Sequence, residues 1–168
     1  ISRFDPSYGG FSDVAGGTCA GRDYFGVTVR PGDQAVFLTT GTGSLVRWLG
    51  PGQCVGVNAV TAGIGTAVRA YDNFLFVGSF AGPDINTAGS VNLSRLLPDG
   101  GAPSTQNVQS AGQVWEISGP SSNVLFAAGW EHAVQRRSRI WEYDPSGGSW
   151  SPVLSGSNDT PLYAIDVP

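Results

Sequence analysis

Apolar residues occur along the chain in short runs, and residues that favour turns separate these runs. In residues 25–29 apolar side chains alternate with small or polar ones, as in a strand with one buried face. Residues 74–77 and 124–128 are continuously apolar, which is typical of a strand that is covered on both faces. No apolar period of 3.6 residues persists over three turns, so we expect little helix. The pattern predicts an all-β protein.

One pattern of four strands returns along the sequence. Similar segments begin at residues 1, 45, 93 and 140. Residues 1–14 align with residues 140–153 without a gap, and half of the aligned positions are identical. A repeat of about 40 to 50 residues that contains several short strands is typical of the blades of a β-propeller. The sequence therefore predicts an all-β fold of the β-propeller class with four-stranded blades.

The predicted blades are complete in three places and incomplete at the two ends of the chain. Residues 24–60, 66–108 and 113–154 each contain four strands, which we name a to d from the propeller axis outward. Residues 1–14 supply only the outer strands c and d of a split blade, and residues 161–168 supply only its inner strand a. We therefore expect a single propeller domain, or a segment of one, whose split blade lacks a strand b.

The last complete blade carries motifs by which the chain resembles a known group of proteins. Residues 125–129 read Leu-Phe-Ala-Ala-Gly, and residues 140–151 read Ile-x-x-Tyr-Asp-Pro-x-x-Gly-x-Trp-Ser. This order resembles the blades of kelch-like propellers and is similar to the extracellular repeats of fungal cortical polarity-marker proteins and of bacterial surface proteins. The paired glycines that follow strand b in kelch repeats are mostly missing. The resemblance implies an extracellular or cell-surface location and a structural or binding role, without a shared catalytic centre.

Charge and composition argue against some classes of partner. The formal net charge is −4 and the pI is about 4.7, which argues against binding to nucleic acid. No stretch approaches 18 consecutive apolar residues, so we expect no membrane span. The sequence contains no Met, so Ile1 is not a translation start, and we expect a processed chain or a part of a longer one.

The two cysteines are Cys19 and Cys54. Neither has the CxxC spacing or the histidine partner of a metal site, and the extracellular character of the composition favours a disulfide between them. The alternative is a pair of buried thiols. Sequons for N-glycosylation occur at Asn92 and Asn158, and they matter only if the chain is secreted from a eukaryotic cell.

The best candidate for a ligand site follows strand b of the last complete blade. We expect there a loop that contains Trp130, Glu131, His132, Arg136 and Arg137. The Trp ring offers a stacking surface and the two Arg side chains offer cations, which suits an anionic or sugar ligand. The alternative is a solvated loop whose charges pair with one another. Another blade has a long loop in the same place, at residues 81–89.

Patterns of catalytic and metal sites are missing from the sequence. His132 is the single histidine, and no nucleophile-elbow motif surrounds a serine. No calcium loop of the EF-hand type is present. Asp5 and Asp144 recur because the Asp-Pro-Ser turn recurs, so we interpret them as turn residues. We therefore predict no catalytic residue, no metal ligand and no cofactor.

Two classes of function remain after these exclusions, with an enzyme as a distant third. The first is a non-catalytic structural or interaction module outside the cell, and the second is a lectin-like propeller that binds a glycan or another ligand. A lectin is expected to repeat its binding residues in every blade, and the loops after strand b do not repeat, which favours the first class.

The open ends of the predicted blades leave three arrangements. The chain closes on itself as a small ring, pairs with a second copy, or completes a longer propeller. We expect assembly by strand pairing through the open edges, with the chain itself or with the remainder of a longer propeller as the partner.

Overall fold

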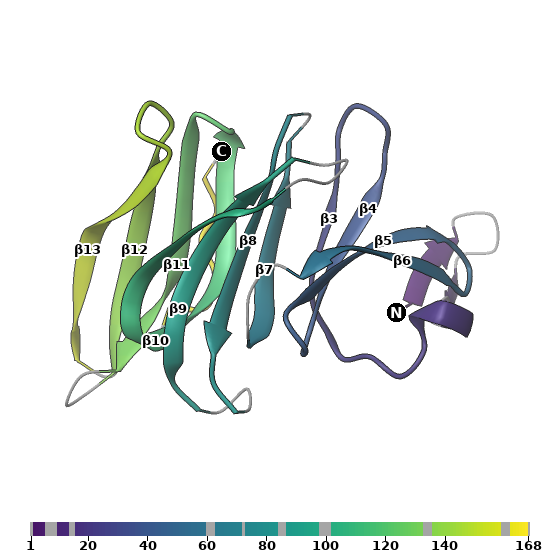
Figure 1. The fold of residues 1–168 in the computed structure, drawn as a ribbon, viewed down its shortest axis with the longest axis horizontal. Coiled ribbons are helices and arrows are strands. Elements are labelled where there is room, and N and C mark those ends of the chain that lie inside the picture. Colours follow the sequence, from purple (N-terminus) through teal and green to yellow (C-terminus); the bar gives the residue numbers. More distant parts are fainter. Residues whose placement is uncertain are drawn as a thin grey trace.

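The computed structural model describes residues 2–5, 10–13, 16–59, 63–71, 73–83, 87–97, 102–132, 136–158 and 162–167, and its strands confirm the all-β prediction (Figure 1). The strands of this part of the chain are β1 (Ser2–Asp5), β2 (Gly10–Asp13), β3 (Tyr24–Val29), β4 (Val36–Thr40), β5 (Ser44–Gly50), β6 (Gln53–Ala59), β7 (Ile64–Ala70), β8 (Leu75–Ala81), β9 (Gly89–Leu96), β10 (Ser104–Ser121), β11 (Val124–His132), β12 (Arg136–Asp144) and β13 (Ser149–Asn158). The same residues contain one turn of 3-10 helix, η1 (Gly17–Cys19), and no α-helix.

The strands form an antiparallel sheet of four strands, an antiparallel sheet of seven and a two-stranded hairpin, and the sheet of seven divides at β10 into two units of four. The first unit is β3-β4-β5-β6, in that order. β10 serves two units, because residues 104–112 pair with β9 and residues 112–121 pair with β11. The second unit is therefore β7-β8-β9 with the first half of β10, and the third unit is the second half of β10 with β11-β12-β13. β1 and β2 form a separate two-stranded hairpin.

The three units occupy nearly the same residues as the three expected blades, and their strands pair in the same register. The third strand of each unit places an Arg or a Glu opposite a Phe of the second strand. These pairs are Arg47 with Phe37, Arg95 with Phe76, and Glu142 with Phe126. The repeat that is visible in the sequence is therefore also a repeat of backbone pairing.

The hairpin β1–β2 repeats the pairing of another hairpin in the chain. In β1–β2, Arg3 pairs with Ser12. The equivalent pair of β12–β13 in the gapless sequence alignment is Glu142 with Ser151, and these two residues also pair. The aligned residues 1–14 and 140–153 thus share their register wherever β1 and β2 are formed.

Each inner strand contains a β-bulge at an equivalent position, which the sequence pattern does not reveal. The bulged residues are Phe25 in β3, Thr66 in β7 and Trp115 in β10. Beside the bulge of β10 the neighbouring strand comes so close that a Cβ atom on Gly129 would overlap the carbonyl oxygen of Gln113. Gly129 is therefore required by backbone packing and not by a turn.

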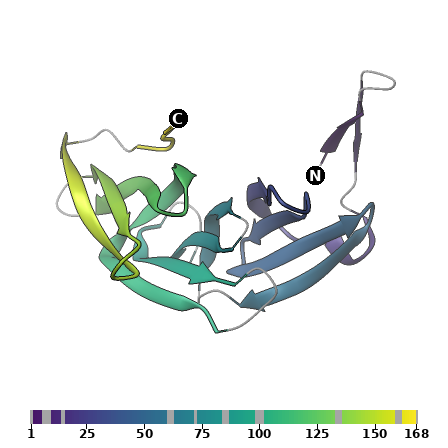
Figure 2. The same ribbon diagram turned by 90° about the horizontal axis from the view of Figure 1, so that it is seen from above.

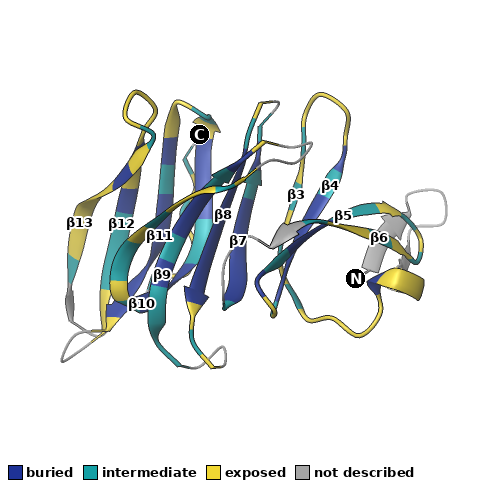
Figure 3. Cartoon of the chain, viewed as in Figure 1, coloured by how far each residue is buried: buried dark blue, intermediate teal, exposed yellow. Residues whose placement is uncertain are grey.

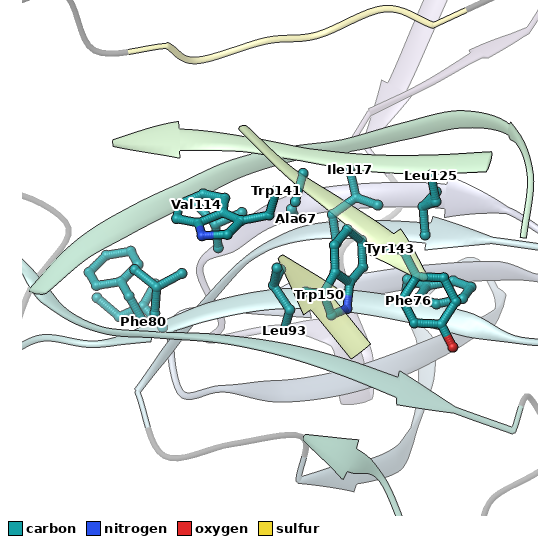
Figure 4. Packing of buried hydrophobic residues seen from close by; sticks show 13 residues of the cluster. Ala67, Phe76, Phe80, Leu93, Val114, Ile117, Leu125, Trp141, Tyr143 and Trp150 are labelled. Atoms are coloured by element: carbon teal, nitrogen blue, oxygen red, sulfur yellow. The ribbon is translucent and has the colours of Figure 1, made fainter. Parts of the chain in front are cut away.

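Two apolar cores hold neighbouring units together. Phe37 of the first unit packs in one core with Val68 and Val77 of the second unit. The larger core lies between the second and third units, and Figure 4 shows its tightly grouped aromatic rings. The ring centroids of Phe76 and Tyr143 are 5.0 Å apart in an edge-on arrangement. Each such buried side chain contributes about 1.5–3 kcal/mol of transfer free energy. Figure 3 shows that β7 and β8 are buried along most of their length.

The three units lie side by side along an arc, with the inner strands β3, β7 and β10 together on its concave side (Figure 2). The hairpin β1–β2 and residues 162–167 lie toward the open side of this arc. The described strands form no closed ring, so the propeller stays a prediction. Residues 162–167 belong to no strand, although we predicted an inner strand in residues 161–168. A strand needs a neighbour for its hydrogen bonds, and the expected split blade has no strand b to provide them.

Cys19 and Cys54 form the predicted disulfide, with their Cα atoms 5.0 Å apart. It ties η1 to β6, beside Thr18, whose hydroxyl oxygen accepts a hydrogen bond of 2.7 Å from the amide of Cys54. The two cysteines are 35 residues apart in the chain. A cross-link over such a loop stabilises a fold by roughly 3–4 kcal/mol in the chain-entropy description.

Candidate functional site

The residues predicted as a ligand loop lie at the end of a two-stranded hairpin. Trp130, Glu131 and His132 end β11, and Arg136 and Arg137 begin β12. His132 pairs with Arg136, and Glu131 pairs with Arg137. The expectation of a loop at these positions is wrong, because antiparallel pairing continues almost to the tip of the hairpin.

Side chains of this hairpin end alternate between two faces, and one face gathers Trp130, His132 and Arg136. The ring centroids of Trp130 and His132 are 6.1 Å apart, and the guanidinium carbon of Arg136 lies 4.9 Å from the centre of the Trp130 ring. Trp130 is only 2 % exposed, whereas His132 and Arg136 are exposed. The structure thus brings these three residues together. However, the guanidinium of Arg136 already lies over the Trp130 ring, where we expected a ligand to stack.

The opposite face holds an ion pair that the sequence analysis missed. Both Nη2 and Nε of Arg139 donate hydrogen bonds to Oε2 of Glu131, at 2.6 and 2.9 Å. Glu131 is buried, and a buried carboxylate requires a charged partner of this kind. Glu131 is therefore a paired structural charge, while the neighbouring Arg137 is exposed. Opposite charges on facing strands were the only sequence signal for the pair.

A second candidate site is a groove of 440 Å³ between the inner strands of the first and second units. It is lined by Val27, Thr28, Val29 and Pro31 of the first unit, Arg69, Ala70 and Tyr71 of the second unit, and Pro120 of β10. The hydroxyl of Tyr71 donates a hydrogen bond of 2.6 Å to the carbonyl of Gly119, and the Arg69 guanidinium lies 5.8 Å from the centre of the Tyr71 ring. The groove therefore combines an apolar wall with one cation.

Burial and nearby charges perturb two acids around this groove. Burial raises the pKa of the Tyr71 hydroxyl, and a hydrogen bond and the charge of Arg69 oppose the rise. Burial also raises the pKa of the Glu116 carboxyl, which the charge of Arg69 lowers and the charge of Asp166 raises further. Arg69, Glu116 and Asp166 thus form one electrostatic cluster from three distant parts of the sequence. Such perturbed groups occur at functional sites and in structural clusters alike.

The recurring turn aspartate has the structural role that we expected. Oδ1 of Asp144 accepts hydrogen bonds from the hydroxyl and the amide of Ser146, at 2.6 and 2.9 Å. These bonds, and first of all the one from the Ser146 hydroxyl, lower the pKa of the Asp144 carboxyl. Asp5 lies in β1, but its side chain is outside the described residues.

The two sequons lie on outer strands. Asn92 is in β9 opposite Asn107, donates through Nδ2 to the carbonyl of Ser90 at 3.2 Å, and accepts through Oδ1 from Nδ2 of Asn107 at 3.2 Å. Asn158 ends β13, but its side chain lies outside the described residues, as do residues 84–86 of the second predicted loop. Glycosylation of either residue stays a prediction.

Within the residues that the structure describes, no group of three or more His, Cys, Asp or Glu side chains could hold a metal ion. The same part of the chain includes no helix that is long and apolar enough to span a membrane. No protein-family model and no curated protein matches this chain, so the geometry of the chain itself must carry a functional argument.

Proposed function

We propose that this chain is a β-propeller, or a segment of one, with kelch-like blades of four strands. It acts as a structural or interaction module outside the cell or at its surface, and it assembles through its open blade edges. The common register of the repeats, the bulge in every inner strand and the arrangement of the units along an arc support this proposal. The disulfide fits an oxidising compartment.

One comparison between equivalent residues carries the proposal. Val27, Val68 and Ile117 each lie two positions after the bulged residue of an inner strand. Val68 is 8 % exposed and Ile117 is 1 % exposed, because each packs in a core with the preceding unit, whereas Val27 is 65 % exposed. The first unit therefore presents an apolar surface that the other two units bury. Another unit of the same kind is the neighbour that would cover it.

Size-exclusion chromatography with light scattering, followed by electron microscopy of the same fractions, tests the assembly. We expect a mass above that of the 17.4 kDa chain and particles with the outline of a ring or a filament. A monomer at all concentrations would contradict assembly. Specific binding on a glycan array would instead favour a lectin-like role.

A further inference from the structure

The hairpin β1–β2 has no described strand partner on either outer edge, and the edge of β1 is the one whose equivalents in the repeat are paired. β1 pairs with β2 along one edge, and no described strand pairs along the other edge. The strands equivalent to β1 are β5, β9 and β12, and each of them lies between two neighbours in its sheet. A free strand edge presents amide and carbonyl groups that an added strand can pair with. The hairpin is therefore an incomplete copy of the unit that the chain builds three times.

The repeat defines which strand would complete the hairpin. In the three units the strand at this position is antiparallel and reads Val-Phe-Leu at residues 36–38, Leu-Phe-Val at 75–77 and Leu-Phe-Ala at 125–127. Its Phe pairs with the residue that aligns with Arg3 of β1. An added strand in the same register would place a Phe opposite Arg3, with an apolar residue on either side.

No described strand lies between β1 and an inner strand, as the second strand does in each unit. In every unit the second strand lies between an inner strand and the strand equivalent to β1. Residues 162–167 lie beside the inner strand of the third unit, since the rings of Tyr163 and Trp115 are 5.7 Å apart. These residues and β1–β2 both lie toward the open side of the arc in Figure 2, and no described strand joins them.

An uncovered apolar strip lies on the inner strand of the first unit. Val27 and Val29 of β3 are exposed, although Leu38 and Val46 on the same face of the first unit are 3 % and 0 % exposed. The uncovered part of the face is thus only as wide as its innermost strand. A further unit packed on this strip would cover it, as the first unit covers Val68 of the second.

We infer that the free edge of β1 binds an extended apolar segment of another polypeptide, antiparallel to β1 and with a Phe opposite Arg3. The segment comes from outside these 168 residues, because β4, β8 and β11, the strands of this type in the chain, are already paired in their own units. Main-chain hydrogen bonds provide the affinity and the Phe fixes the register, as in other cases of strand addition. The inference rests on the proposed function and names the kind of partner that the open edge takes.

Hydrogen–deuterium exchange of the amides of residues 2–5 tests the inference. The probe is a synthetic peptide with the sequence of residues 122–132, which contains Phe126 and is a strand of the required type. The matched control is the same peptide with Phe126→Asp. In a sample that light scattering shows to be monomeric, the probe should slow exchange at β1 by about tenfold or more, and the control should not. In a sample of this chain that assembles with itself, the amides of residues 2–5 should still exchange fast, because its strands of this type are already paired, and the probe should slow them as it does in the monomer.

Unchanged exchange in the monomeric sample, equal effects of both peptides, or protection at the free edge of β13 would overturn the inference. In an assembled sample of the chain alone, slow exchange at residues 2–5 before the probe is added would overturn it as well, because another copy of the chain would then pair with β1. If the chain binds the peptide but is monomeric in its absence, only the self-assembly that we proposed as part of the function would be contradicted. Assembly without any effect of the probe at residues 2–5 would contradict only the inference drawn here.

Discussion

Glu131 illustrates, at the scale of single residues, how a charged side chain can be part of the core. It is buried at the end of β11 and bonded through one carboxylate oxygen to two nitrogens of Arg139. Arg139→Ala would leave this carboxylate without its partner, and we expect the free energy of unfolding to fall by about 2–3 kcal/mol. Arg137→Ala, in the same strand but exposed, should change it by less than about 0.5 kcal/mol. Denaturant unfolding measures both, and equal losses would show that the pair is not what stabilises the hairpin.

Glu116 is a residue whose contribution depends on pH. Burial raises the pKa of its carboxyl above the ordinary value of 4.5. When the pKa of the folded state is raised, the stabilising contribution is complete below the unfolded pKa and is lost as the pH rises through the folded pKa. Glu116→Gln should therefore raise the melting temperature at pH 7, and the gain should disappear as the pH falls below 4.5. Thermal unfolding across this range tests the expectation, and a gain that does not change with pH would contradict it.

The sequence predicted the role of a single residue well where that residue type has few possible roles. Cys19 and Cys54 had no metal-ligand pattern, so a disulfide was the main alternative, and the structure forms it. Trp130 had several possible roles. Its burial beneath Arg136 depends on which strand faces which, and this register is not visible in the residue types alone.

At the scale of strands and their pairing, Gly129 tests the close approach between two neighbouring strands of the third unit. A Cβ atom there would overlap the backbone of β10, so Gly129→Ala requires the two strands to move apart. We expect this substitution to lower the free energy of unfolding by about 3 kcal/mol. Gly56→Ala is the control, because a Cβ atom at this exposed position meets no atom within 4 Å. Denaturant unfolding compares the two, and a tolerated Gly129→Ala would argue against the close packing at the bulge.

Strand positions were predictable because the apolar runs are short and well separated by turns. The run at residues 74–77 corresponds to β8, and the run at residues 124–128 to β11. The bulges were not predictable, since Phe25, Thr66 and Trp115 share no side-chain property. A bulge arises from the backbone geometry of the paired strands, and that geometry follows from the packing of one unit on the next.

At the scale of the whole molecule, the sequence repeat predicts which strands pair with one another, but it does not predict whether the sheets close into a ring. The four-stranded sheet packs against the seven-stranded sheet through one apolar core, and the larger core lies within the seven-stranded sheet. No described strand pairs with the second edge of β1, and residues 162–167 form no strand. The repeat pattern reports the pairing within a unit, and it carries no signal for what pairs with an open strand edge.

The repeat provides a matched pair of substitutions that separates assembly from folding. Val27 and Val68 are equivalent residues of neighbouring inner strands, the first 65 % exposed and the second 8 % exposed. Val68→Asp would place a charge in the core between two units and should lower the free energy of unfolding by about 4 kcal/mol. Val27→Asp should leave the melting temperature of the isolated chain nearly unchanged and abolish the assembled species in light scattering. If the Val27→Asp variant assembled like the unsubstituted chain, the exposed face of β3 would not be the surface that contacts the neighbouring unit in the assembly.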